Sequence, residues 1–201
     1  MPLAEQEHTE EKWISSDERF NQLYPFHIQT LADRHWTPFM VARKAAAFLA
    51  AEKKVKILDI GSGAGKFCLA AACSKPLAFY YGVEQRKGLV IEAEIVKRKL
   101  QLENVFFIHG NFTQLDFKKY DHFYFFNSFY ENLTGTKKID DSIEYSQELY
   151  NYYNRYLFNQ LQRMPAGTKL VTYHSLQDEV PECYQLVAAE IDNLLKYWIK
   201  I

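Results

Sequence analysis

An acid followed by three alternating glycines is the first group in the chain whose residue types and spacing suit ligand chemistry. It reads Asp59-Ile60-Gly61-Ser62-Gly63-Ala64-Gly65. Glycines at alternate positions let the backbone adopt positive φ and approach a ligand closely. The Asp59 carboxylate has the charge to pair with a ligand ammonium group, directly or through water. We therefore predict a ligand-binding turn whose contacts are Asp59, Gly61, Ser62, Gly63 and Gly65.

Further polar positions follow along the chain. Glu84 lies about 20 residues beyond the glycines, where an acid accepts ribose hydroxyls in dinucleotide-binding folds, and Gln85 adjoins it. Asn111 has an amide that can hydrogen-bond an adenine edge, and Phe112 can pack on the ring. Singly, each residue also fits a structural role, as a tight turn, an acid at a helix N-terminus or a core aromatic. Their joint order and spacing predict a nucleoside-cofactor site.

Two other glycine-rich ligand sites do not fit this turn. A phosphate-binding P-loop needs glycine five residues before a Gly-Lys pair and a hydroxyl residue after it. Here Ile60 stands at the first position and Phe67 at the last, on either side of Gly65-Lys66. A dinucleotide fingerprint needs G-x-G-x-x-G, and Lys66 stands at its final position.

The elements that must position these residues can be predicted from hydrophobic periodicity and turn residues. The predicted strands cover residues 55–60, 78–83, 105–108, 122–126, 169–173, 184–191 and 194–201, and Asp192-Asn193 forms a two-residue hairpin turn. The predicted helices cover residues 38–51, 67–73, 87–102 and 141–164, and two short ones lie between 15 and 36. Thr37-Pro38 is expected to be an N-cap followed by the first helical residue.

Alternating strands and helices predict an α/β, Rossmann-like three-layer sandwich with a mostly parallel seven-stranded sheet. The last two strands form an antiparallel hairpin at its edge. Residues 1–36 form an N-terminal helical extension, which either covers the cofactor as a lid or packs on the sheet. Residues 37–201 form the cofactor-binding domain. Ligands bind at the carboxyl ends of strands in such folds, so the predicted contacts converge there.

The stretch from about Trp36 to Leu133 resembles the class I, seven-strand S-adenosylmethionine-dependent methyltransferases. Their first motif matches Asp59 through Gly65, their ribose-binding acid matches Glu84, and their adenine-contact position matches Asn111 with Phe112. Members usually carry Asp where Asn111 stands. The resemblance implies S-adenosylmethionine as cofactor and S-adenosylhomocysteine as product. The segment from Thr37 to the glycine motif is also similar to small protein-lysine methyltransferases.

The predicted acceptor region is Asn127-Ser128-Phe129-Tyr130, after the fourth strand. Methyltransferases acting on planar nitrogens have an Asp or Asn, two prolines and an aromatic residue there; this chain keeps Asn127 and Tyr130 without the prolines. The segment beginning at Phe126 also resembles the Asn-Asn-Phe segment of non-SET histone lysine methyltransferases. We take Asn127 and Tyr130 as catalytic candidates, and Asn127 with Thr37 as further cofactor contacts, Thr37 at the methionine carboxylate. A polar turn beside a buried strand is the structural alternative.

Composition bounds the remaining functions. The net charge of −1 gives no global field for nucleic acid, the three cysteines have no C-x-x-C spacing, and the six histidines show no ligand spacing. We therefore expect a cytoplasmic protein with no metal, no membrane span and no nucleic-acid partner. The leading hypothesis is methyl transfer to a nitrogen, with protein lysine favoured. The alternatives are a small-molecule methyltransferase and a non-catalytic cofactor-binding subunit.

Overall fold

A seven-stranded sheet organises the computed structural model, which describes residues 16–175 and 179–201. The strand order is β3-β2-β1-β4-β5-β7-β6; β1 to β5 run parallel, and β7 pairs antiparallel with both β5 and β6. The strands are β1 (Lys56–Ile60), β2 (Phe79–Glu84), β3 (Val105–His109), β4 (His122–Phe126), β5 (Lys169–Tyr173), β6 (Tyr184–Glu190) and β7 (Leu195–Lys200). The predicted fold class and each predicted strand are confirmed, with boundaries shifted by a residue or less.

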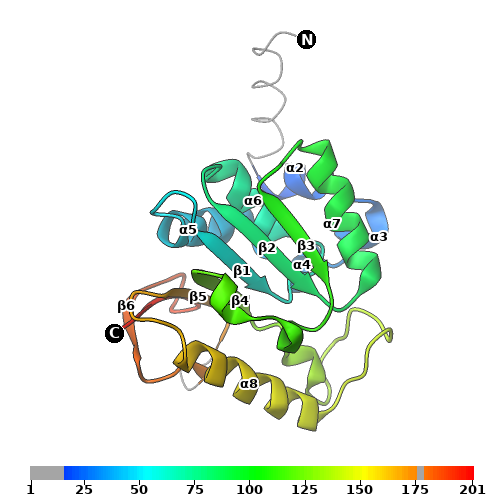
Figure 1. The fold of residues 1–201 in the computed structure, drawn as a ribbon. Coiled ribbons are helices and arrows are strands. Elements are labelled where there is room, and N and C mark those ends of the chain that lie inside the picture. Colours follow the sequence, from blue (N-terminus) through cyan, green and yellow to red (C-terminus); the bar gives the residue numbers. More distant parts are fainter. Residues whose placement is uncertain (1–15, 176–178) are drawn as a thin grey trace.

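Helices cover the two faces of the sheet unequally (Figure 1). Helices α5 (Phe39–Leu49), α6 (Lys66–Ser74) and α7 (Lys87–Lys99) pack on one face. The other face is covered by α8 (Gln147–Gln162), together with 3-10 turns at Phe112–Gln114 and Phe117–Lys119 that no sequence pattern predicted. The three layers follow from this arrangement.

Strand β1 shows why the central strands are continuous apolar runs. Ile57 belongs to the core beneath α5 and α6, whereas its neighbour Leu58 belongs to the core beneath α8. Both side chains are fully buried. Because side chains alternate across a strand, a strand covered on both faces must be apolar at successive positions.

The hairpin at the sheet edge differs from the prediction at its turn. The connection between β6 and β7 spans residues 191–194 rather than Asp192-Asn193 alone, and Leu194 N–H donates to the Ile191 carbonyl at 2.9 Å. Ile191, Asp192 and Asn193 all have positive φ. Strand β6 therefore ends one residue earlier than expected, and β7 begins one residue later.

Helix α8 begins later than the predicted helix of residues 141–164. Its N-cap is Ser146, whose hydroxyl accepts the Leu149 N–H at 3.1 Å, and residues 141–145 form an irregular segment. The predicted apolar face is confirmed, because Tyr153, Leu157 and Leu161 are buried. The apolar spacing thus identified the helix. Tertiary contacts of Arg86, described below, keep residues 141–145 from extending it.

The described part of the N-terminal extension contains three short helices, α2 (Asp17–Asn21), α3 (Phe26–Gln29) and α4 (Ala32–His35), rather than two. The part of the extension that comprises residues 1–15 lies outside the described residues. The expectation that Thr37 caps the next helix is wrong. Helix α5 begins at Phe39, and the Phe39 N–H donates to the Asp17 carboxylate of α2 at 2.9 Å.

Candidate cofactor and acceptor site

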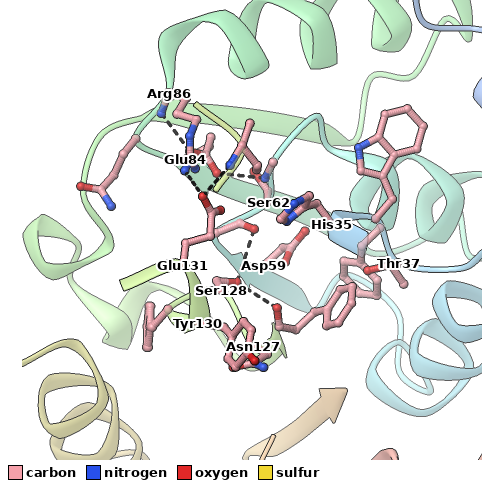
Figure 2. A pocket seen from close by; sticks show the side chains of 18 of the residues that line it. His35, Thr37, Asp59, Ser62, Glu84, Arg86, Asn127, Ser128, Tyr130 and Glu131 are labelled. Carbon is pink, nitrogen blue, oxygen red and sulfur yellow. Dashed lines mark hydrogen bonds and ion pairs between the residues drawn. The ribbon is translucent and has the colours of Figure 1, made fainter. Parts of the chain in front are cut away.

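A cavity of about 630 Å³ opens at the carboxyl ends of β1, β2, β4 and β5, on both sides of the point where the strand order reverses between β1 and β4. This is where ligands bind in open parallel sheets. The predicted residues that line it are Thr37, Asp59, Gly61, Ser62, Gly63, Glu84, Gln85, Phe112, Asn127 and Tyr130. Figure 2 shows Asp59 near the middle, with Glu84 and Arg86 on one side and Asn127 and Tyr130 on another. Gly65 and Asn111 are not among the lining residues.

The three glycines of the turn serve different purposes. Gly61, Gly63 and Gly65 all have positive φ. A Cβ on Gly61 would lie 2.4 Å from the Cβ of Ser128, and one on Gly65 would lie 2.4 Å from the Phe107 ring, so both sites are closed by packing. A Cβ on Gly63 would meet nothing within 4 Å. Gly63 therefore leaves open space at the cavity wall, whereas Gly61 and Gly65 let the turn pack against its neighbours.

Ser62 reaches the cavity through its backbone rather than its hydroxyl. Its Oγ is buried and has no hydrogen-bond partner among the described residues. A Cβ on Gly82 of β2 would lie 2.7 Å from that Oγ, so the hydroxyl faces β2. The predicted contribution of Ser62 to a ligand is thus restricted to its main chain.

Glu84 is the last residue of β2, and both oxygens of its carboxylate accept hydrogen bonds from the protein. Its Oε2 accepts the Gly63 N–H at 3.1 Å, and its Oε1 accepts the Arg86 N–H at 2.8 Å and Arg86 Nη1 at 3.3 Å. A carboxylate offers about four lone-pair sites. One site on Oε2 remains for a ligand hydroxyl, and a second hydroxyl would have to displace the long Arg86 contact.

Arg86, which sequence reasoning missed, connects the end of β2 to the segment after β4. Besides Glu84 it contacts Glu131 at 2.6 Å, Asp140 at 3.3 Å and the Tyr145 hydroxyl at 2.7 Å. Burial alone would lower its pKa, but the charges of Glu131 and Glu84 outweigh it and the pKa of Arg86 is raised. These contacts fix residues 141–145 as a cavity wall and explain why they do not extend α8.

Asp59 lies at the end of β1 with 4% of its surface exposed. Burial raises the pKa of its carboxyl to about 8; the hydrogen bond from Cys68 opposes this shift and the charge of Glu84 adds to it. The Cys68 Sγ lies 3.7 Å from Asp59 Oδ2. A buried carboxyl of this kind favours a cationic partner, because a nearby positive charge stabilises its ionised form.

Thr37 is held at the cavity wall by a tyrosine of the sheet. Its hydroxyl is 3.0 Å from the Tyr124 hydroxyl, and both residues are buried. The Tyr124 ring stacks on Phe67 of α6, with centroids 3.8 Å apart. Thr37 therefore has a fixed side chain rather than the capping role expected for it.

Asn111 and Phe112 have different surroundings in the structure: Phe112 lines the cavity and Asn111 does not. The Asn111 amide donates to Gln85 at 3.1 Å and to the Tyr153 hydroxyl at 2.8 Å, and its oxygen caps the 3-10 turn that follows. Phe112 lines the cavity and stacks on Phe129, with centroids 5.0 Å apart. Asn111 thus links Gln85 to α8 through hydrogen bonds, and Phe112 forms an apolar part of the cavity wall.

The side of the cavity at Asn127, where the sequence predicts the acceptor region, is aromatic. Asn127 directly follows β4, and around it the lining includes Phe126, Tyr130, Tyr173 and His174. Phe126 packs on Tyr173 with centroids 4.8 Å apart, and Tyr130 is 50% exposed. An opening beside Asn127, lined by rings and reachable from outside, can admit a substrate to the cofactor end.

The N-terminal helices both pack on the domain and reach the cavity. Phe20 of α2 is fully buried, and the Tyr24 hydroxyl donates to the Ala64 carbonyl of the glycine turn at 2.9 Å. His35 and Trp36 line the cavity, as does Lys66, whose ammonium pairs with Asp17. Burial lowers the pKa of Lys66, and the hydrogen bond to Asp17 opposes that shift.

Many lining residues were absent from the sequence-based candidates, among them Lys66, Arg86 and His174. Lys66 had served only in the comparison with the P-loop and the dinucleotide fingerprint. The partners of Arg86 other than Glu84 are distant in sequence. His174 directly follows a predicted strand, which is a usable signal, because that is where the other candidates were found. Within residues 16–175 and 179–201, no cluster of three or more metal-ligating side chains occurs, and no helix is long and apolar enough to cross a membrane.

The sequence and structure resemble known methyltransferases. A family model described as a methyltransferase domain matches residues 51–197. The tRNA (guanine-N(7)-)-methyltransferase of Microcystis aeruginosa is 44% identical over 54 residues, which are 27% of this chain and 26% of that protein. The protein of the same name from Nostoc sp. is 32% identical over 85 residues, or 42% of this chain and 38% of that protein. The matches thus span well under half the length of these relatives.

Solved structures share the fold. An RNA methyltransferase from Salinibacter ruber in complex with S-adenosyl-L-homocysteine aligns with a TM-score of 0.57 at 18% identity, covering 82% of this chain and 93% of that one. TrmN from Thermus thermophilus aligns with a TM-score of 0.60 at 18% identity, covering 87% and 52%. The matched sequence relatives are named as tRNA methyltransferases, which counts against the expectation that a nucleic-acid partner is unlikely. That expectation rested on the net charge of −1 and on the scarcity of basic clusters in the sequence, and a local surface can bind RNA regardless of net charge.

Proposed function

The chain belongs to the class I, S-adenosylmethionine-dependent methyltransferase family, and we propose that it transfers the methyl group to a nitrogen acceptor that enters beside Asn127. The observation that carries this proposal is one continuous cavity with two unlike ends. One end has the acids and the open glycine of a nucleoside site, and the other has the aromatic opening. A non-catalytic subunit would need no such opening.

The residues of the first end fit the cofactor. Because Gly63 has no side chain, the cofactor can contact the protein backbone there. Asp59 is a buried acid suited to the cofactor's ammonium group. Glu84 retains a lone-pair site for a ribose hydroxyl, and Phe112 provides an apolar surface for the adenine. The volume of about 630 Å³ lies within the range of small-molecule and cofactor sites.

When bound, the cofactor supplies an electrophilic methyl group on a sulfonium. The chain's task is then to position the acceptor in line with that methyl group and to exclude water. Asn127 offers an amide oxygen that can accept a hydrogen bond from an acceptor N–H. Tyr130 and Phe126 offer ring faces that orient a planar or cationic group.

Cofactor binding is tested by titration calorimetry with S-adenosylmethionine and S-adenosylhomocysteine. Wild-type protein is expected to bind both, and Glu84→Ala is expected to weaken binding at least tenfold through the lost ribose contact. Lys53→Ala, at an exposed residue outside the cavity lining, is the control and should bind as wild type does. Absence of binding by folded wild-type protein, or full affinity in Glu84→Ala, would contradict the cofactor assignment.

The acceptor class is tested with cofactor labelled on the methyl group, incubated with protein and RNA fractions of a cell extract. Label in the protein fraction favours amine acceptors such as lysine. The second candidate is an RNA base, favoured by the names of the matched relatives. Label confined to RNA would select it. Label only in the small-molecule fraction would select the small-molecule alternative.

A further inference from the structure

His174 lies at the aromatic end of the cavity and has no assigned role. It directly follows β5, just as Asn127 directly follows β4, and the last residues of these strands, Phe126 and Tyr173, are register partners. Asn127 and His174 therefore stand side by side at the acceptor end, and both line the cavity. The side chain of His174 is exposed to the cavity mouth.

The imidazole is held by rings and not by hydrogen bonds. It packs edge-on against Tyr173, with centroids 4.3 Å apart and planes at 75°, and against Phe126 at 5.7 Å. Among the described residues no hydrogen bond engages either ring nitrogen. The His174 N–H is satisfied by the Leu194 carbonyl at 3.0 Å, so the backbone is anchored while the ring nitrogens remain available.

The backbone at this position is unusual. His174 has φ +56° and Asn127 has φ +39°, whereas most residues other than glycine avoid positive φ. Such conformations are strained and concentrate at functional sites, where the surrounding structure enforces them. Two adjacent strands thus each end in a left-handed polar residue at the cavity wall.

The ring is neutral near pH 7. Burial lowers the pKa of His174, and the charged group at the near end of the packed strand β7 is Lys196, whose Nζ donates to the Ser175 carbonyl at 3.4 Å. Lys169 and Lys200 lie at the opposite ends of β5 and β7. The Tyr173 and Tyr197 hydroxyls are uncharged at this pH, and burial raises the pKa of each further. A neutral imidazole can accept a proton.

We propose that His174 is the general base of the transfer and that the acceptor is a primary or secondary amine, which must lose a proton to react. The inference rests on the proposed function and narrows its acceptor. An ammonium between aromatic rings and beside a sulfonium has a lowered pKa, because burial and a like charge both disfavour its charged form. The imidazole takes the proton from this nitrogen, which frees its lone pair.

The transfer forms one bond and breaks one. The amine lone pair forms the new N–C bond with the methyl carbon, the C–S bond breaks, and its electron pair stays on sulfur to give the neutral thioether. The imidazolium formed at His174 returns its proton to water at the cavity mouth. A ring nitrogen that carries no proton, such as N7 of guanine, needs no general base. A requirement for His174 as general base therefore distinguishes amine acceptors from such ring nitrogens.

The test compares wild type with His174→Asn, since Asn tolerates positive φ well and the variant should fold. Transfer of labelled methyl into untreated cell protein is measured beside the same protein with its amines acetylated. We expect wild type to label only the untreated protein. His174→Asn should bind S-adenosylhomocysteine within twofold of wild type but lose 10²-fold to 10⁴-fold in rate, as for other general bases. Added imidazole should restore part of the rate.

The pH profile gives a second readout. The wild-type rate at limiting substrate should rise with pH along a limb whose midpoint is the His174 pKa, below 6.5, as measured independently by NMR titration. That limb should vanish in His174→Asn and persist in the surface control His27→Gln. Full rate with an unchanged profile in His174→Asn, or label that survives acetylation, overturns the inference alone. Wild-type protein that labels no fraction overturns the proposed function, and the inference with it.

Discussion

The guanidinium of Arg86 and the carboxylate of Glu131 form an ion pair with an N–O distance of 2.6 Å, which joins the end of β2 to the segment that follows β4. Both side chains are largely buried, with 7% and 13% exposed. Arg86 also reaches Glu84, so the acid predicted to hold the ribose and the wall of the cavity share one cation. The cofactor end of the site is thereby coupled to the conformation of the β4–α8 segment.

Replacing Arg86 by Gln should lower the free energy of unfolding by about 3 kcal/mol, because a buried pair that loses one partner leaves the other charge uncompensated. Urea denaturation measures this change. The variant should also bind S-adenosylhomocysteine at least tenfold more weakly by calorimetry. Arg155→Gln, on the exposed side of α8, is the matched control and should change neither quantity appreciably. Equal unfolding midpoints for Arg86→Gln and wild type would contradict the coupling.

Asp59 predicts a pH dependence of stability. Its pKa of about 8 in the folded protein exceeds the ordinary value of 3.8, so between these values the native state holds a proton that the unfolded state has lost. The free energy of unfolding should therefore fall as pH rises through this window. Asp59→Asn removes that dependence. The folded and ordinary pKa values differ by about four units, each worth about 1.4 kcal/mol, so the variant should exceed wild type in stability at pH 8 by up to about 6 kcal/mol.

The control for this prediction is Asp192→Asn, an exposed turn residue whose substitution should leave the pH dependence intact. Parallel unfolding curves for Asp59→Asn and wild type from pH 5 to 8 would show that Asp59 is ionised in the native state.

Cofactor binding at pH 7 should release about one proton, because the ligand's ammonium group stabilises the ionised form of Asp59. Calorimetry in buffers of different ionisation enthalpy measures the number released. Asp59→Asn should release none and should bind more weakly. Proton uptake, or no exchange in wild type, would place the ammonium group elsewhere.

The glycines of the turn should respond differently to alanine. Gly61→Ala adds a Cβ 2.4 Å from Ser128 at positive φ, so it should destabilise the fold by about 3 kcal/mol. Gly63→Ala has open space and bears only the cost of positive φ, about 1 kcal/mol. Yet Gly63→Ala should reduce cofactor affinity at least tenfold, because its Cβ enters the ligand's space.

Gly88→Ala in α7 is the control for the glycine series, since it has no positive φ and meets nothing within 4 Å. It should be neutral or stabilising by up to about 1 kcal/mol, in line with helix propensity. Thermal unfolding and calorimetry of the three variants separate folding from binding. Unimpaired binding by folded Gly63→Ala would remove the glycine from the cofactor site.

Asp17 should matter more than its place in a short helix suggests. Its carboxylate accepts the Phe39 N–H at the start of α5 and pairs with the buried Lys66. Asp17→Ala should lower the free energy of unfolding by about 3 kcal/mol, because it removes a cap and leaves a buried ammonium unpaired. The neighbouring exposed acid gives the control, Glu18→Ala, for which a change below about 0.5 kcal/mol is expected in urea denaturation.

The acid and glycines from which the site was first inferred are local signals, and the sequence by itself determined much from them. Buried parallel strands require continuous apolar runs, so β1 and β4 were predicted nearly residue by residue. Asp59 and Glu84 lie at the carboxyl ends of their strands, and parallel strands bring such positions to one edge of the sheet. Their convergence on one cavity therefore followed from the fold class alone. The roles assigned to them there remain predictions.

Only the tertiary structure decided the features that depend on partners distant in the chain. Arg86 contacts Glu131 and Tyr145, which lie 45 and 59 positions later in the sequence. Hydrophobic periodicity cannot reveal that network, which ends the helical pattern before Ser146. Asp17 displaced Thr37 as the cap of α5 for the same reason, because a long-range carboxylate reached the Phe39 N–H. His174 gained its place beside Asn127 from strand pairing, which a single sequence does not encode locally.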